Sequence, residues 1–280
     1  MTIEQNHSVT HTTASLLYTI PPTDGSKPYL SITNLSDKNF TQEEKKSVVT
    51  NLRSAPNASD LTLNTAGFQL YQDKSTFKNF DKEQEIIEQY YPLIVELIKE
   101  KTGGSRVQIY DHTIRRNRPG EDGSKPDRRT PVFNVHVDQT PKSAEARVHR
   151  HNPEDAEELL KKRYQLINVW RPIDNPAYDK PLAVCDFRSV DSKDLLPVSL
   201  IYPDYNGETY AVRYSPEHEW YYAKDMSEDE VLFIKCFDSE HFKDGSISGL
   251  SPHTAFVDPQ TSSEAPLRNS IEIRTIVYYE

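Results

Sequence analysis

The sequence has 280 residues, of which 35% are hydrophobic and 10% aromatic, so residues 1–280 can bury a sizeable core and are expected to fold as a single domain. Its 33 lysines and arginines face 43 aspartates and glutamates, which gives a formal net charge of −10 at pH 7. Nucleic acid and anionic membranes attract basic surfaces, and this charge therefore argues against either as a partner.

The sequence shows no signal for export or for membrane insertion. It begins Met-Thr-Ile-Glu-Gln, without the basic and then apolar segments of a signal peptide, and no run approaches the roughly 20 apolar residues of a spanning helix. Cys185 and Cys236 each lie in an apolar run, where a buried free thiol behaves as a small hydrophobe. We expect a soluble, cytoplasmic protein whose two cysteines are structural.

The first hundred residues predict an arm, small strands and one long helix. Residues 1–14 are polar and rich in threonine, and they are expected to form a loose arm. Turn signals between short apolar pieces predict small strands and loops from Leu16 to about Gln72. Residues 81–103 predict a helix that buttresses a sheet, because apolar side chains recur with helical spacing, acids occupy the first turn and glycine follows the end.

The rest of the chain predicts many short strands separated by Pro, Gly and Asp. The strand-like runs are residues 106–110, 131–137, 165–169, 182–185, 198–202, 209–214, 220–223, 231–237 and 270–278. Helices do not alternate regularly with these runs. The succession therefore favours a double-sheet jelly roll, mainly β with flanking helices, over a parallel sheet.

Two segments interrupt the strands. Residues 141–162 are charged and predict a helical insertion or lid, in which Asn152 would cap a helix that begins at Pro153. Residues 115–129 are rich in Arg, Gly, Pro and Asp and predict an exposed loop. This loop would serve either as a lid or as a plain connection between strands.

A histidine and an aspartate two residues apart are the first candidates for chemistry. They lie in the alternating run Val132-Phe-Asn-Val-His136-Val-Asp138, and side chains at positions i and i+2 of a strand face the same way. Asn134, His136 and Asp138 would therefore share one face. One distant histidine would complete the two-histidine, one-carboxylate set that holds iron with open coordination positions. The dipeptide spacing is common by chance, so context must decide.

Three later histidines could supply the third ligand: His218, His241 and His253. We favour His253, because Arg268 follows it at a distance compatible with the next strand or two. His218 comes sooner in the chain but lies in a turn-like segment typical of a surface or packing residue. His149 and His151 lie on the charged segment, which predicts a solvated surface and not a metal site.

An arginine after the last histidine would suit an oxygenase that uses 2-oxoglutarate. Such an enzyme chelates the C1 carboxylate and 2-keto group of this cosubstrate at iron, and it needs a cationic fork for the C5 carboxylate. Arg268 with the neighbouring hydroxyl of Ser270 supplies one. Arg274, which has the same strand parity as Arg268, is the main alternative, and Arg213 and Arg171 are further ones. Each of these arginines could also be a salt-bridged strand residue.

Five other residues are candidates for supporting roles. Trp170 and Arg171 end an apolar strand and could line a substrate pocket, since tryptophan offers a broad apolar face. Metal-bound imidazoles and carboxylates need orienting partners, and Tyr110, Gln139 and Thr140 could orient the ligands or bind the cosubstrate. Ordinary packing is the alternative for each of them.

The order His136-Val-Asp138, then His253, then Arg268-x-Ser270 resembles the Fe(II)/2-oxoglutarate-dependent oxygenases, whose fold is a double-stranded β-helix, a cupin-like jelly roll. More narrowly, the chain resembles the fungal gibberellin-desaturase-like and cephem-hydroxylase-like group. The runs that carry this resemblance are His136-Val-Asp-Gln-Thr-Pro, Asn168-Val-Trp-Arg-Pro, Pro181-Leu-Ala-Val-Cys-Asp, Lys235-Cys-Phe-Asp-Ser and Arg268-x-Ser-Ile-Glu-x-Arg274. It extends from near Val107 to the C-terminus and more weakly back to Gly67. The interval between Asp138 and His253 departs from the best-known Fe(II)/2-oxoglutarate-dependent oxygenases, in which the second histidine comes sooner.

The resemblance implies Fe(II), 2-oxoglutarate and dioxygen as cofactors, with His136, Asp138 and His253 as the catalytic metal ligands. It implies a small-molecule substrate from secondary metabolism, such as a terpenoid or meroterpenoid. Members of the group hydroxylate, desaturate or rearrange such compounds, and some fungal relatives build endoperoxides. The resemblance does not choose among these reactions, and assembly as a homodimer is left open.

Two other functions fit the same residues. A metal-dependent hydrolase could use the same ligands to activate water, but it would not need an arginine fork after the last histidine. A jelly-roll binding module without catalysis could use His136 and Asp138 for structural hydrogen bonds.

Overall fold

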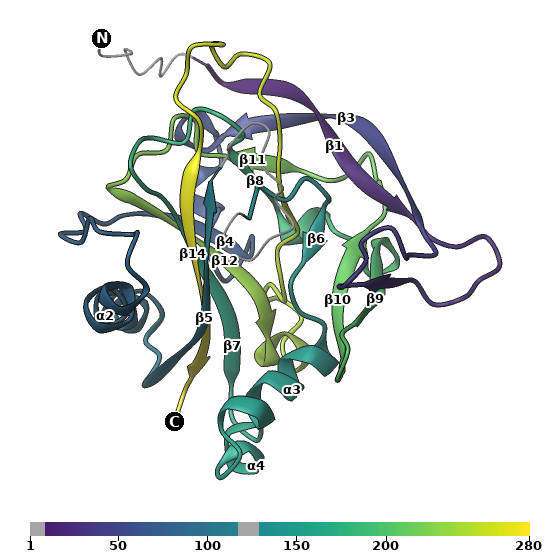
Figure 1. The fold of residues 1–280 in the computed structure, drawn as a ribbon, viewed down its shortest axis with the longest axis vertical. Coiled ribbons are helices and arrows are strands. Elements are labelled where there is room, and N and C mark those ends of the chain that lie inside the picture. Colours follow the sequence, from purple (N-terminus) through teal and green to yellow (C-terminus); the bar gives the residue numbers. More distant parts are fainter. Residues whose placement is uncertain (1–8, 117–128) are drawn as a thin grey trace.

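Two β-sheets form the framework of the computed structural model, which describes residues 9–116 and 129–280 (Figure 1). The larger sheet has nine strands in the order β1-β3-β11-β8-β13-β6-β10-β9-β2, and the smaller has five in the order β4-β12-β7-β14-β5. The strands are β1 (His11–Ile20), β2 (Tyr29–Ser31), β3 (Thr41–Asn51), β4 (Phe68–Gln72), β5 (Arg106–Arg116), β6 (His136–Val137), β7 (Tyr164–Pro172), β8 (Leu182–Cys185), β9 (Leu195–Ile201), β10 (Asn206–Val212), β11 (Trp220–Tyr222), β12 (Glu230–Asp238), β13 (His253–Ala255) and β14 (Asn269–Tyr278).

The two sheets pack face to face, as the predicted jelly roll requires. One apolar cluster joins Trp170 and Leu232 of the smaller sheet to Val184 and Tyr221 of the larger. Most strand neighbours within the sheets are distant in sequence, because the chain passes repeatedly between the sheets. The predicted strand-like runs all contain observed strands, and β8 has the predicted bounds.

The run at residues 131–137 is the one in which most of the predicted strand is wrong. Only His136 and Val137 form β6, which pairs with β10 and β13. Asn134 makes an isolated bridge to Leu17 instead. Burial alternates only from Asn134 to Asp138, where Val135 and Val137 are buried and the residues between and beside them are half-buried.

The long predicted helix is confirmed in position and is built from three pieces: α1 (Glu83–Glu85), a π-helical turn (Ile86–Tyr90) and α2 (Tyr91–Thr102). Gly103 ends it with a left-handed backbone (φ 74°) while its N–H donates to the carbonyl of Lys99. Its apolar side chains cover the outer face of the smaller sheet, where Ile167 and Ile273 belong to the same cluster.

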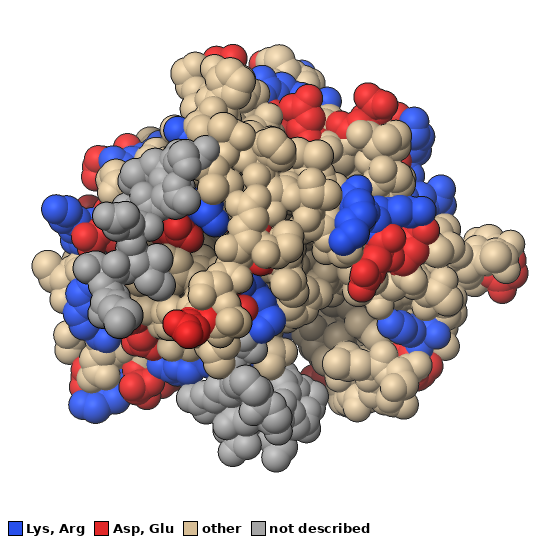
Figure 2. Space-filling model, turned by 90° about the horizontal axis from the view of Figure 1, so that it is seen from above, with Lys and Arg blue, Asp and Glu red and all other residues tan. Residues whose placement is uncertain are grey.

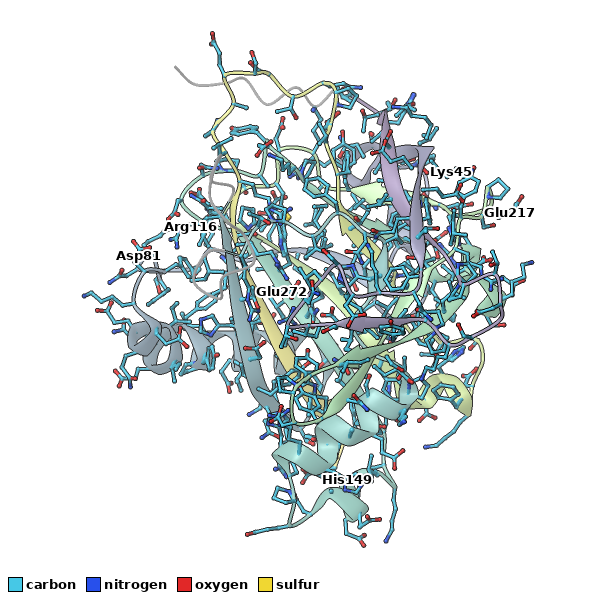
Figure 3. All side chains as sticks on the ribbon, turned by 45° about the vertical axis from the view of Figure 1, so that its right-hand side comes forward. Lys45, Asp81, Arg116, His149, Glu217 and Glu272 are labelled. Atoms are coloured by element: carbon cyan, nitrogen blue, oxygen red, sulfur yellow. The ribbon has the colours of Figure 1, made fainter. Side chains whose placement is uncertain are left out.

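Strand alternation then decides which side chains of the smaller sheet face the interior. Ile271 and Ile273 of β14 pack under the helix, so Ser270, Glu272 and Arg274 point toward the space between the sheets. Figure 3 shows Glu272 near the middle of the molecule. The five-stranded sheet therefore has an apolar outer face and a polar row on its inner face.

The segment at 141–162 is helical, but the predicted helix start is wrong. The main helix is α3 (Pro141–His151), and α4 (Ala156–Leu159) follows it. Asn152 is the C-cap of α3 and donates its backbone N–H to the carbonyl of Val148, whereas Thr140 caps the start of α3. Proline is favoured in the first turn of a helix, and Pro141 and Pro153 both offered such a start.

Two further predictions concern the N-terminal arm at residues 1–14 and the exposed loop at residues 115–129. Residues 11–14 of the predicted arm lie in β1 and pair with residues 47–50 of β3, with Thr12 and Ala14 buried. The arm prediction is wrong for these residues, and residues 1–8 lie outside the described part of the chain. Most of the predicted 115–129 loop, residues 117–128, also lies outside it.

The remaining predictions concern the cysteines, membrane-spanning helices and the charge of the surface. Cys185 and Cys236 are buried free thiols, as predicted. Within residues 9–116 and 129–280, none of the helices combines the length and the apolar character that crossing a bilayer requires. Figure 2 shows acidic and basic side chains interspersed around one face, with uncharged residues in its middle.

Candidate metal centre and cosubstrate site

Three side chains from two neighbouring strands of the larger sheet meet between the sheets. His136 of β6 lies opposite His253 of β13 in the strand pairing, and Asp138 follows β6 directly. One potential ligand atom from each residue lies within 4.8 Å of the other two. In the described part of the chain, this is the one group of at least three His, Cys, Asp or Glu side chains that could hold a metal ion.

Backbone carbonyls orient both imidazoles. The Nδ1 atom of His136 lies 2.8 Å from the carbonyl oxygen of Asn134, and that of His253 lies 3.1 Å from the carbonyl of Ser251. A carbonyl only accepts, so each Nδ1 carries the hydrogen and each Nε2 keeps its lone pair. The ring centroids are 4.5 Å apart. Both imidazoles are therefore in the tautomer that offers Nε2 as a metal ligand.

The two carboxylate oxygens of Asp138 have different roles. Oδ2 accepts a hydrogen bond from Nδ2 of Asn168 at 2.7 Å and another from Nε of Arg274 at 3.3 Å. Oδ1 lies 3.6 Å from Nε2 of His136 and faces the cluster. One oxygen is thus held by the protein, and the other is available to a cation.

Burial and neighbouring charges control protonation of the cluster. Burial and, to a smaller extent, the facing His253 lower the pKa of His136 to about 4, although Asp138 opposes the shift. Burial raises the pKa of Asp138, but Arg274 and the two histidines outweigh it and hold that pKa well below its ordinary value. At neutral pH the cluster presents an unprotonated imidazole at His136 beside a carboxylate, which is the form that binds a divalent cation.

Arg274 is committed to carboxylates on every side. Its Nε donates to Asp138, its Nη1 lies 2.9 Å from Asp111, and its Nη2 lies 2.5 Å from Glu272. Nη1 also donates to Thr113 at 3.0 Å. With its donors occupied in this way, Arg274 has no free fork for the carboxylate of a cosubstrate.

Arg268 comes one residue before β14, has the same parity as Arg274, and has the opposite surroundings. It is 2% exposed, and its Nη1 donates to the carbonyl of Lys180 at 2.5 Å. Its Nε has no hydrogen-bond partner, and neither does the buried hydroxyl of Ser270 two residues along. Burial and, to a smaller extent, nearby Arg115 lower the pKa of Arg268 to about 9. Orphaned buried donors of this kind are costly unless a ligand satisfies them.

Two more side chains complete the wall around Arg268. The guanidinium lies over the ring of Trp170, 5.4 Å from its centroid, and this contact fixes its plane. Arg115 of β5 pairs with Ser270 in the strand register, so a second cation adjoins the same hydroxyl. The donor set of an arginine fork, a hydroxyl and a second cation suits a carboxylate.

The other residues predicted to support the site either lie on the opposite face of the sheet or make structural contacts. Arg171 forms an ion pair with Asp73 and donates to the carbonyl of Glu228 at 2.8 Å, on the sheet face covered by the long helix. Its predicted place in the substrate pocket is therefore wrong, because consecutive strand residues face opposite sides. Trp170, its neighbour, faces inward.

Gln139 and Thr140 secure the start of α3. The hydroxyl of Ser143 donates to Oε1 of Gln139 at 2.9 Å, and that of Thr140 donates to Glu208 at 2.6 Å. Tyr110 packs its ring 5.3 Å from the ring of His151, and burial raises its pKa. These contacts anchor the helix that follows Asp138.

The alternatives for the third ligand and the arginine lie apart from the cluster. His218 is 3.3 Å from Asp194 and stacks near Tyr18, and it is not among the clustered residues. Arg213 is exposed. Figure 3 shows His149 on α3, where its imidazole is 3.9 Å from Glu145.

Sequence reasoning missed the residues that hold the site together. Asn168 holds Asp138, while Glu272 and Asp111 hold Arg274. The signal for Asn168 and Glu272 was present, because a polar residue interrupts a buried apolar strand in each case. Only the pairing of β5, β7 and β14 shows that these residues meet.

Taken together, the fold and the clustered side chains define a jelly-roll protein with a two-histidine, one-carboxylate site. The family model described as YDMC, an oxidoreductase/YMDC permease-like domain, matches residues 16–278. The hydroxylase/desaturase efuI of Hormonema carpetanum is 38% identical over 254 residues, which are 83% of each chain. The alpha-ketoglutarate-dependent dioxygenase phiK of a fungal species is 30% identical over 272 residues, 95% of each chain.

Solved structures agree with the sequence comparisons. The iron and alpha-ketoglutarate-dependent endoperoxidase NvfI superposes with a TM-score of 0.85 at 28% identity, over 96% of this chain and 98% of that one. The chain therefore belongs to the family of Fe(II)/2-oxoglutarate-dependent oxygenases that these fungal enzymes represent, and it is a dioxygenase that acts on a small molecule. The predicted fold, a double-stranded β-helix, is confirmed.

Proposed function

We propose that His136, Asp138 and His253 hold Fe(II), and that Arg268 with Ser270 binds the C5 carboxylate of 2-oxoglutarate. The observation that carries this assignment is the contrast between two arginines of the same strand parity: Arg274 forms ion pairs with three carboxylates, whereas Arg268 and Ser270 keep orphaned polar atoms. The substrate is a secondary metabolite, and the reaction is a hydroxylation, a desaturation or the formation of an endoperoxide.

The protein's own part in the reaction is to bind, orient and exclude water. Bound iron and 2-oxoglutarate would supply the oxidising power, by coupling oxidative decarboxylation of the cosubstrate to the activation of dioxygen. His136 and His253 present Nε2 lone pairs, because their Nδ1 hydrogens are held by carbonyls. Asn168 and Arg274 hold one oxygen of Asp138, so the other keeps its direction.

The fork at Arg268 determines how the cosubstrate lies. A bidentate contact fixes both position and plane of a carboxylate, and Trp170 keeps the guanidinium plane from rotating. With one end held there, the keto acid at the other end is directed toward the three ligands. The apolar contacts between the sheets exclude water from this space.

The test uses the absorption of the assembled site. Adding Fe(II) and 2-oxoglutarate to the protein without oxygen should produce a visible metal-to-ligand charge-transfer band. The His136→Ala variant should lack the band, and oxygen admitted to the wild-type complex should produce succinate slowly even without substrate. A wild-type protein with neither the band nor succinate formation would contradict the assignment.

The alternative of a metal-dependent hydrolase loses its support. It gives no role to the orphaned atoms of Arg268 and Ser270, and the relatives above are oxygenases. A lid role for residues 141–162, a homodimer and a cytoplasmic location stay predictions.

A further inference from the structure

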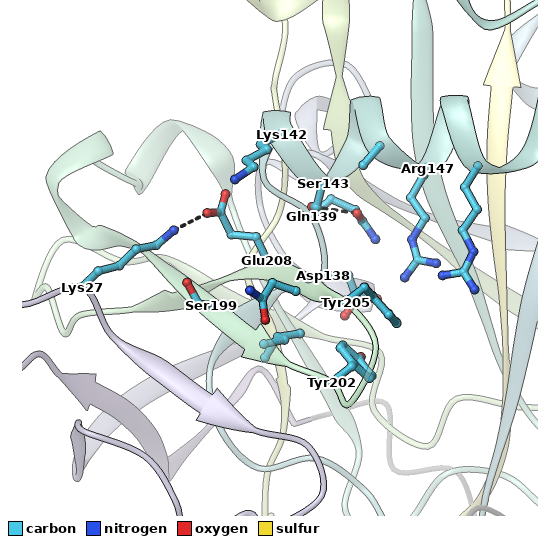
Figure 4. Close-up of a pocket in the computed structure, with 15 residues that line it drawn as sticks. Lys27, Asp138, Gln139, Lys142, Ser143, Arg147, Ser199, Tyr202, Tyr205 and Glu208 are labelled. Atoms are coloured by element: carbon cyan, nitrogen blue, oxygen red, sulfur yellow. Dashed lines mark hydrogen bonds and ion pairs between the residues drawn. The ribbon is translucent and has the colours of Figure 1, made fainter. Parts of the chain in front are cut away.

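A cavity of about 190 Å³ lies between α3 and the hairpin of β9 and β10 (Figure 4). Asp138 and Gln139 form part of its wall, so the cavity reaches the carboxylate of the metal cluster. Lys142, Ser143 and Arg147 line it from α3, while Tyr202 and Tyr205 belong to the hairpin. Its volume is below the range of about 300 to 1,000 Å³ typical of sites for whole drug-sized ligands, so it suits one ring with its substituent.

The charge of this cavity is opposite to that of the chain. Four basic side chains line it, Lys27, Lys142, Arg147 and Arg150, against two acidic ones, Asp138 and Glu208. The protein as a whole has a net charge of −10. A basic cavity in an acidic protein attracts anions locally, because the field is focused within the low-dielectric walls.

Existing contacts use up both acids, but three of the four bases, Lys142 and the two arginines, form no ion pair within the described residues. Glu208 lies 2.5 Å from Lys27 and accepts a hydrogen bond from Thr140. Asp138 belongs to the metal cluster. Among the described residues, Arg147 and Arg150 form no ion pair. Two guanidinium groups therefore remain available to an anion in this cavity.

Aromatic rings form the opposite wall. The rings of Tyr202 and Tyr205 stack with centroids 4.3 Å apart and an interplanar angle of 8°. The guanidinium of Arg150 lies 5.4 Å from the centroid of Tyr205, and that of Arg147 lies 5.1 Å from the centroid of Tyr110. These contacts hold the two cations over the faces of aromatic rings.

We propose that this cavity is the substrate subsite of the oxygenase and that it selects a molecule with an anionic group on a flat ring. This proposal rests on the proposed function, since it makes the ligand of the cavity the molecule to be oxidised. Arg147 and Arg150 bind the carboxylate or phenolate, and the tyrosine pair packs against the ring. The rest of the molecule extends past Gln139 toward Asp138, which places its reacting carbon beside the metal cluster.

The test measures binding of benzoate, with neutral benzamide as the isosteric control. Ligand-observed NMR on the metal-free protein, with 2-oxoglutarate in saturating excess to fill the Arg268 site, should show that benzoate binds more tightly than benzamide. Arg147→Gln and Arg150→Gln should each weaken benzoate binding by about tenfold, as expected when one charge-assisted contact is lost. Arg213→Gln, which removes an exposed charge elsewhere, should leave it unchanged.

A second measurement tests whether the cavity adjoins the metal. Mn(II) bound to the wild-type cluster should broaden the ring protons of bound benzoate, and His136→Ala should abolish this effect. Equal binding of benzoate and benzamide, unchanged binding in both arginine variants, or complete displacement by 2-oxoglutarate would each overturn the proposal.

These outcomes are separate from those that test the proposed function. If the charge-transfer band forms but the arginine variants bind benzoate normally, the oxygenase assignment stands and the subsite falls. If no band forms but benzoate binds through Arg147 and Arg150, the cavity is an anion site and its role as the subsite of an oxygenase is lost. Arg150 is exposed, so its substitution leaves the fold intact and keeps the binding test decisive.

Discussion

Arg274 on β14 and Arg268 just before it are both arginines of the same strand parity, but their surroundings are opposite. Arg274 is surrounded by Asp138, Asp111 and Glu272. Arg268 is buried against Trp170, with an orphaned Nε and an orphaned hydroxyl beside it. The comparison teaches that burial and strand position do not identify a ligand-binding arginine. An unpaired Nε beside an unpaired hydroxyl distinguishes Arg268, since Arg171 also has an unpaired Nε but lies on the sheet face covered by the long helix.

This difference also separates stability from binding. Three carboxylates in one small region would repel one another without Arg274, so that guanidinium is part of the folded structure. Arg268 has the reverse balance, because its burial costs free energy that a bound carboxylate would repay. Substitutions at the two positions should therefore be read in different assays.

The largest expected effect is on stability, at Arg274. Arg274→Gln leaves the carboxylates around it without their shared cation, and removing one partner of a buried ion pair costs about 3 kcal/mol or more. We expect the free energy of unfolding, measured by urea denaturation of the metal-free protein, to fall by about this amount. Arg213→Gln serves as the control for removing a positive charge. Unchanged stability together with a greatly raised KM for 2-oxoglutarate would transfer the anchoring role to Arg274.

The next largest effect concerns the cosubstrate, at Arg268. Arg268→Gln removes a cationic fork, and two charge-assisted hydrogen bonds correspond to a rise of about 100-fold in the KM for 2-oxoglutarate. Iron binding should be retained. Arg268→Lys keeps a positive charge but not the two-pronged guanidinium, so its KM for 2-oxoglutarate should lie between those of the wild-type protein and Arg268→Gln. An unchanged KM for 2-oxoglutarate in Arg268→Gln would mean that Arg268 does not bind the cosubstrate.

A smaller effect, on metal affinity, is expected at Asn168 of β7, which donates to the proposed ligand Asp138. Asn168→Leu deprives Oδ2 of Asp138 of its shorter hydrogen bond, and loss of such an orienting partner weakens metal binding by about tenfold. Gln165→Leu is the matched control, because Gln165 lies on the same strand and donates to Asp238 at 2.6 Å. Fe(II) titration should separate the two variants. Equal losses in both would mean that the effect is general destabilisation.

The last prediction is a pH dependence of the metal-free protein. The pKa of His136 is lowered to about 4 by burial, so between about pH 6.5 and 4 the unfolded chain takes up a proton that the folded chain does not. Stability from this residue is present above the unfolded pKa and is lost as the pH falls through this window, by at most about 1.4 kcal/mol per unit. His136→Asn should flatten the slope of unfolding free energy against pH. An identical slope in the variant would contradict the lowered pKa.

Much of the fold was predictable because its signals are local. The helix at 81–103 follows from apolar spacing and from glycine at its end, and the strand runs follow from β-branched residues between turn signals. The start of α3 was not found, since Pro141 and Pro153 both suit a first helical turn. Arg171 was misplaced although strand parity alone puts it on the face opposite Trp170, and its partner Asp73, 98 positions away in the chain, is seen only in the tertiary structure.

The sequence by itself determined the sheet-rich class of the protein and the shared direction of His136 and Asp138, because backbone preference and strand parity act over a few residues. It could not separate Arg268 from Arg274, which have the same parity and similar neighbours. Only the tertiary structure distinguishes their surroundings, by bringing β5, β7 and β14 together. It likewise placed His253, and not His218, beside the first two ligands. The physical reason is that a side chain's role depends on which of its donors and charges are already satisfied, and those partners are distant in sequence.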